Sequence, residues 1–122
     1  MMRMLVLLAV LFLAMSATAW AEGEPGAWQT AADIALTPER LAPLEEALTG
    51  LVGVAYEPVA YLGSQVVAGV NHAYLCRATV AYPAAQPAWK LVFVCEPLEG
   101  PAEINLIADL DLAALAAPLS PD

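Results

Sequence analysis

The chain has 122 residues, a formal net charge of −9, and 13 Asp and Glu residues against only four Lys and Arg residues. This acidic balance argues against nucleic acid and anionic membrane surfaces as partners, because both carry negative charge themselves. Hydrophobic residues make up 61% of the chain, but an apolar N-terminal segment and many alanines inflate that fraction.

Residues 1–21 are predicted to be a secretory signal peptide. They contain a positive charge at Arg3, then an apolar run, then small residues at Ala19 and Ala21 that fit an A-x-A cleavage site. The apolar run is shorter than the about 20 residues of a membrane-spanning helix. We therefore expect a secreted or periplasmic protein, soluble after cleavage, in which residues 22–122 form a single domain.

The segment that follows predicts a short strand and the start of a helix. Residues 22–26 (EGEPG) are an acidic leader, and residues 27–31 (AWQTA) favour a first strand. Thr37 is a good N-cap, and Pro38 suits the first helical position because the proline nitrogen has no hydrogen to leave unpaired. A helix is therefore expected to begin here.

A leucine stripe indicates that this helix is amphipathic. Apolar residues recur at three- and four-residue spacing at Leu41, Leu44, Leu48 and Leu51. Gly50 or Gly53 can end the helix. Pro43 removes one helical hydrogen bond, which predicts either a kink or a regular helix that begins at that proline.

The remainder of the chain predicts strands separated by turns. Four segments rich in β-branched and aromatic residues follow the helix, at residues 54–65, 70–82, 88–96 and 102–112. The short turns between them favour an antiparallel meander. The predicted fold class is therefore α+β, with one helix packed across a twisted four- to five-stranded antiparallel sheet.

The two cysteines, Cys76 and Cys95, are predicted to form a disulfide, as an even pair in an exported chain usually does. If Tyr82 and Trp89 pair across the PAAQPA loop, the two cysteines face each other directly, within reach of a disulfide. This bond would stabilise the fold by roughly 3 kcal/mol. The same register predicts the core face, which carries Tyr74, Cys76, Ala78, Val80 and Tyr82 opposite Trp89, Leu91, Phe93 and Cys95.

No catalytic residue, cofactor or metal site is predicted. His72 is the only histidine, and it lies roughly 13 Å along the strand from Cys76, too far for a nucleophile and its base. Cys76 and Cys95 with one histidine also lack the usual spacing of zinc ligands. Several carboxylate pairs could be assembled, but no spacing in the sequence sets their geometry. We therefore expect that the protein is not an enzyme.

One predicted hairpin tip is apolar, although turns normally favour polar residues. The tip matches the Gln-x-Val-x-Gly hairpin motif of the cystatins, and Asn71 extends the match. The matching residues are Gln65, Val66, Val67, Ala68 and Gly69.

Two further cystatin features have partial counterparts. Pro87 and Trp89, separated by one residue, resemble the Pro-Trp pair of a second cystatin hairpin. Gly26 resembles the glycine before the first cystatin strand. The order of predicted elements is also similar to that of a cystatin over most of residues 22–122.

The resemblance implies a reversible, non-covalent inhibitor of papain-like cysteine proteases. In cystatins these segments form an apolar wedge that fills the protease cleft without presenting a cleavable bond. By that likeness Val66 to Gly69 would be the wedge, Gln65 would shape it, Pro87 and Trp89 would make the second contact, and Gly26 would act as a hinge.

Other interpretations of the same residues stay open. The tip could pack on its own protein, and Trp89 could be a packing residue. Cystatin-like folds also serve as non-inhibitory binding or structural modules, because a fold does not fix a function. A straightened apolar hairpin would in addition allow a domain-swapped dimer.

Overall fold

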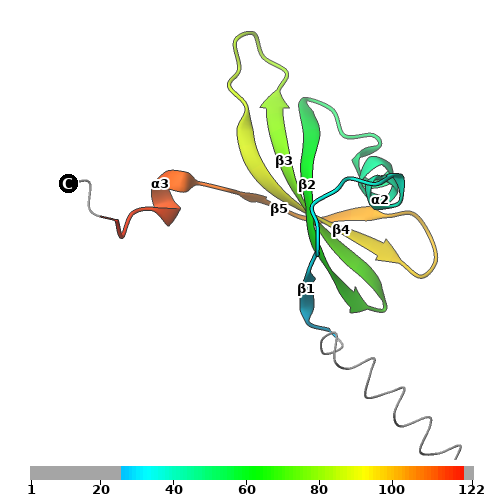
Figure 1. Cartoon of the computed structure of the whole chain (residues 1–122). Helices are drawn as coiled ribbons and strands as arrows, with labels where there is room; N and C mark the ends of the chain where they lie inside the picture. Colours follow the sequence, from blue (N-terminus) through cyan, green and yellow to red (C-terminus); the bar gives the residue numbers. More distant parts are fainter. Residues whose placement is uncertain (1–25, 120–122) are drawn as a thin grey trace, which may run out of the picture.

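The structure, a computed structural model, describes residues 26–119, so the predicted signal peptide lies outside the described residues. The described part forms one five-stranded antiparallel sheet whose strand order follows the chain, with α2 against one face (Figure 1). This arrangement confirms the predicted α+β class. The elements are β1 (Trp28–Thr30), α2 (Pro38–Leu48), β2 (Val54–Val67), β3 (Gly69–Val80), β4 (Ala88–Pro97), β5 (Glu103–Asp109) and α3 (Leu112–Leu115).

Helix α2 begins at the residue that the sequence indicated and ends at Leu48, so Leu51 of the predicted stripe lies outside it. The Thr37 hydroxyl accepts a hydrogen bond from the Arg40 backbone N–H at 3.2 Å, and Pro38 occupies the first turn. A single helix extends across Pro43 to Leu48, so the regular part does not start at that proline. Gly50 has a φ of +89°, the left-handed conformation that glycine adopts after a helix.

The hydrophobic core lies between α2 and the sheet. Leu44 is 1% exposed, the most deeply buried residue of the leucine stripe. The Glu46 side chain accepts a hydrogen bond from the Ala102 backbone N–H at 2.5 Å, which ties the end of α2 to the start of β5. The buried cluster contains Leu44, Tyr61, Tyr74, Cys76, Val92, Val94 and Ala102.

The register of β3 against β4 differs from the predicted one by five residues. Cys76 lies opposite Lys90, and Cys95 lies opposite Asn71. Because five is odd, the two cysteines are on opposite faces of the sheet, about 17 Å apart along the strands. Both are free thiols, and the disulfide prediction is therefore wrong.

The predicted core face is wrong on β4 for the same reason. Val92 and Val94 are fully buried beneath α2, in place of the odd-numbered residues of the strand. The connection between the last paired residues, Ala78 and Ala88, has nine residues, whereas the prediction placed only the six residues of the PAAQPA loop between Tyr82 and Trp89. Ala84 adopts a φ of 60° within it.

The odd-numbered residues of β4 lie instead on the face turned away from α2. Side-chain alternation and the strand pairing bring them together with residues of β1, β3 and β5. Trp28 and Phe93 pack edge to face there, with ring centroids 5.6 Å apart. We call this surface the open face, defined by Trp28, Leu75, Leu91, Phe93 and Leu106.

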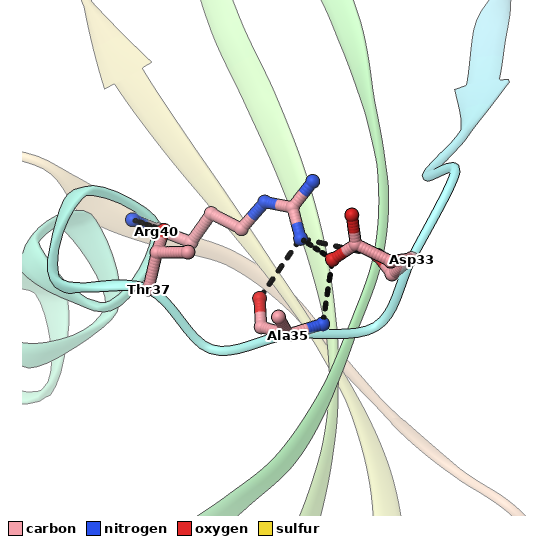
Figure 2. Close-up of polar contacts among 4 residues, drawn as sticks. All are labelled: Asp33, Ala35, Thr37 and Arg40. Carbon is pink, nitrogen blue, oxygen red and sulfur yellow. Dashed lines mark hydrogen bonds and ion pairs between the residues drawn. The ribbon is translucent and has the colours of Figure 1, made fainter.

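A polar cluster fixes the connection between β1 and α2 (Figure 2). The Arg40 guanidinium donates to the Asp33 carboxylate at 3.0 Å and to the Ala35 carbonyl at 2.8 Å, and Ala35 N–H donates to the same carboxylate. The guanidinium also lies 4.5 Å from the centre of the Tyr61 ring, a cation–π contact. The Tyr74 hydroxyl donates to the Arg40 carbonyl at 2.5 Å. Arg40 thus joins the connection, the helix and the sheet.

The last predicted strand is shorter than expected. Strand β5 ends at Asp109, and residues 112–115 form the short helix α3 instead of continuing the strand. The Asp111 carboxylate accepts hydrogen bonds from the N–H groups of Ala113 and Ala114 at 3.0 and 3.2 Å. An aspartate cap of this kind favours a helix start over an extended chain. Within residues 26–119 no helix is long and apolar enough to cross a membrane.

The two thiols should differ strongly in reactivity. Burial of Cys76 raises its pKa to about 11, whereas Cys95 is partly exposed on the side away from α2. We expect iodoacetamide to label Cys95 in the folded protein and Cys76 only after unfolding, because the thiolate is the reacting form. Peptide mass spectrometry measures both rates, and Cys95→Ser is the control that removes the fast reaction. An intact mass that lacks both thiol hydrogens would contradict the assignment of free cysteines.

The Asp33–Arg40 ion pair should make the stability of the fold depend on pH in the acidic range. The Ala35 N–H and the Arg40 guanidinium hold the pKa of Asp33 below its ordinary value of 3.8. A lowered folded-state pKa contributes stability above the unfolded value, and that contribution is lost as the pH falls through the folded value. We expect Asp33→Asn to lower the melting temperature at neutral pH and to match the unaltered protein well below pH 3.8. If the two proteins differ in melting temperature by the same amount at both pH values, the charge of Asp33 is not responsible for the difference.

Candidate functional site

The β2–β3 hairpin presents an exposed apolar tip at one end of the sheet. Val67 pairs with Gly69 across a turn at Ala68. Val66 is 57% exposed and Val67 44% exposed, while Gly69 is buried. The described residues therefore leave the apolar side chains of the tip in contact with water.

Gly69 is required by the backbone at this turn. Its φ is +117°, and an added Cβ would lie 2.5 Å from the Glu96 carbonyl oxygen. Any other residue would force β3 away from β4 at the point where Gly69 pairs with Pro97. Because Gly69 has no side chain, the end of β4 can lie directly beside the tip.

Gln65 fixes the base of the tip on its other side. Its side-chain NH₂ donates to the Gly26 carbonyl at 2.7 Å, and its side-chain oxygen accepts from the Asn71 amide at 2.8 Å. The Gly26 N–H donates to the Val66 carbonyl at 3.2 Å. Gly26, predicted as a hinge, therefore lies directly beside the tip, and Gln65 links it to β3.

The turn between β4 and β5 lies on the opposite flank of the tip. Because Gly69 pairs with Pro97, the residues that follow Pro97 project at the same end of the sheet. Leu98 is the first of them and is 81% exposed. Leu98 was not among the predicted site residues, although Pro97-Leu98 is an uninterrupted proline and large apolar residue at a predicted turn.

The structure does not bring Pro87 and Trp89 to this site. Trp89 pairs with Arg77, nine residues along β3 from Ala68, which corresponds to about 30 Å. The loop that contains Pro87 joins β3 to β4 at the other end of the sheet from the tip (Figure 1). The two hairpins are consecutive in an antiparallel meander, so their turns must lie at opposite ends.

A polar row, buried at Tyr61 and exposed at Glu96, supports the strands below the tip. The Tyr61 hydroxyl lies 2.7 Å from His72 Nδ1, and His72 Nε2 lies 3.0 Å from a Glu96 carboxylate oxygen. Burial raises the pKa of the Tyr61 hydroxyl above its usual value. The row connects β2, β3 and β4, and sequence analysis did not identify it because its three residues are far apart in the chain.

The exposed apolar tip is suited to binding a partner by shape. Residues 65–71 carry no charged side chain, so the tip can be desolvated at little electrostatic cost. Within residues 26–119 no group of three or more His, Cys, Asp or Glu side chains could hold a metal ion.

Comparisons with protein-family models, with curated proteins and with solved structures find no significant match to this chain, so its function is inferred from the geometry of the site.

Proposed function

We propose that the protein is a secreted, reversible and non-covalent inhibitor of papain-like cysteine proteases. The observation that carries the proposal is the exposed apolar tip at Val66, Val67 and Ala68, held from both sides by its own chain. An apolar segment that a protein fixes in water is best explained by a partner that buries it.

The tip is held in place before binding. Gln65 is bonded to both Gly26 and Asn71, and Gly69 is closed against β4. A preformed loop loses little conformational entropy when it enters a cleft, and this raises its affinity. The chain also reverses at Ala68, so it offers no extended bond of the kind that a protease cleaves.

The proposed contact surface has three segments, and Leu98 replaces Trp89 as the second hairpin contact. Gly26 lies on one flank of the tip and the β4–β5 turn lies on the other. Leu98 is the largest exposed apolar side chain at that turn. Together the segments form an edge rather than a pocket, which fits a concave partner.

Val67→Asp is expected to abolish inhibition without unfolding the protein. The variant would have to bury an unpaired carboxylate in the protease cleft in place of a valine. This should raise the inhibition constant by at least about a hundredfold. The measurement is a titration of papain with a fluorogenic peptide, using protein purified from export of the full coding sequence. Val52→Asp is the matched control, because Val52 is 90% exposed in the loop before β2.

Three results would overturn this proposal. The first is a folded protein that inhibits none of a panel of papain-like proteases. The second is full inhibition by Val67→Asp. The third is a melting temperature that falls sharply with Val67→Asp and not with Val52→Asp, which would show that the tip packs on its own protein.

Leu98→Ala and Trp89→Ala separate the two candidate second contacts. We expect Leu98→Ala to weaken inhibition by roughly tenfold or more, because truncating a buried leucine at an interface costs more than 1 kcal/mol. Trp89→Ala should leave the inhibition constant unchanged, since Trp89 lies at the far end of the sheet. The reverse pattern would show that the contact surface does not include the β4–β5 turn.

A further inference from the structure

The open face is a large apolar surface with no covering element among residues 26–119. Helix α2 packs on the other side of the sheet, and on the open face Leu75, Leu91 and Phe93 are half-buried by their neighbours while Trp28 and Leu106 are exposed. Trp28 is 46% exposed and Leu106 is 55% exposed. A sheet face of this composition is normally covered, because an antiparallel sheet that faces water carries polar side chains on that side.

A second apolar surface without a partner lies on the segment after β5. We call residues 110–119 the arm. Leu112, Leu115 and Leu119 are 65%, 64% and 73% exposed and recur at three- and four-residue spacing. Backbone hydrogen bonds from Ala116 N–H to Leu112 and from Leu119 N–H to Ala116 continue the helical turns. Leu112 and Leu115 lie on α3 and Leu119 lies in the turns that follow, so the three leucines make the arm apolar along its length.

The arm does not cover the open face of its own chain. Its first residue is held at the sheet, because Leu110 N–H donates to the Trp89 carbonyl at 3.1 Å. Beyond Leu110 the arm extends away from the sheet (Figure 1). All the residues of α3 are exposed.

We infer that the protein forms a symmetric dimer in which the arm of each chain packs on the open face of the other. One chain carries both apolar surfaces, and an arm that points away from its own sheet is placed to reach a second copy. Reciprocal exchange covers both surfaces in both chains and closes the assembly at two copies.

Charge favours the arm as the point of contact. The described residues contain three basic residues, and each already has an acidic partner: Arg40 with Asp33, Arg77 with Glu57, and Lys90 with Asp109. Two such acidic chains repel each other over most of their surfaces. Residues 112–119 carry no charge, so this part of the arm can approach a second copy without that repulsion.

The dimensions also fit. Helix α3 has four residues, about 6 Å of helix, and the turns after it carry the arm on to Leu119, so the arm is long enough to cross two neighbouring strands that are about 4.8 Å apart. Five side chains of the two surfaces are about half exposed or more, and if each of them loses about 100 Å², two exchanges bury roughly 1,000 Å². They are Trp28, Leu106, Leu112, Leu115 and Leu119. That area reaches the about 1,000 Å² that a specific interface needs.

This dimer differs from a hairpin exchange and does not depend on the proposed inhibition. The β2–β3 hairpin stays closed, and the arm leaves from the end of the sheet opposite to the tip. The tip of each copy is therefore free to bind a protease.

The test is the oligomeric state of the protein purified from export of the full coding sequence. Sedimentation equilibrium from micromolar to millimolar concentration should give a dimer. Leu115→Lys on the arm and Leu106→Lys on the open face should each weaken dimerisation by at least about a hundredfold, because the dimer buries each leucine twice. Leu98→Lys is the matched control, an 81% exposed leucine outside both surfaces, and it should leave the dimer intact.

Circular dichroism and thermal melting of each variant at low concentration check that the monomer stays folded. Both test positions are exposed in the single chain, so their substitution should leave the fold intact. A monomer at all concentrations would overturn the inference, including the case in which the arm folds onto its own sheet. A dimer that survives Leu115→Lys would also overturn it and would indicate hairpin exchange instead.

Discussion

The pairing of β3 with β4 decides the character of both faces of the sheet. With Cys76 opposite Lys90, β4 turns Val92 and Val94 toward α2 and its intervening residues to the other side. Because side chains alternate along a strand, no intermediate arrangement exists, and an odd shift exchanges the two faces completely. The core, the open face and the separation of the two cysteines all follow from this one register.

Two kinds of interaction hold that sheet in place. The valines and aromatic residues of the core exclude water beneath α2, which gives most of the stability. Because the hydrophobic effect is non-directional, it does little to fix how the elements are oriented. Polar contacts fix the orientation of the elements. Arg40 joins the β1–α2 connection to Tyr61 and Tyr74, and the row from Tyr61 through His72 to Glu96 ties three strands together. The bonds of Tyr61 to His72 and of Tyr74 to Arg40 are partly buried, and there they are stronger than in water.

The apolar tip is an outcome of the same construction. Gly69 permits β3 to begin against the end of β4, and Gln65 secures Gly26 on the opposite flank. The tip is therefore rigid as well as exposed, and both properties favour binding to a preformed concave surface. The open face and the arm are two further exposed apolar surfaces, and neither is covered by another element among residues 26–119. Both cases link exposed apolar area to an interaction with another molecule.

Local features of the sequence were sufficient where neighbouring residues decide the structure. Thr37 and Pro38 begin α2, Gly50 follows its end, and the apolar segments between turns form an antiparallel meander. The tip at Val67 and Ala68 was likewise predictable, because the motif and the turn are contiguous. Caps, turns and periodicity depend on contacts within a few residues.

Only the tertiary structure decided what depends on distant residues. The separation of Cys76 from Cys95 required the β3–β4 register, which a loop of several residues leaves free. The exchange of Trp89 for Leu98 beside the tip followed from that register and from the alternation of turns between the two ends of a meander. The sequence determined the elements and the apolar tip, and strand pairing determined which side chains share a face. Elements are set by local contacts, whereas pairing is set by which faces the whole sheet can bury.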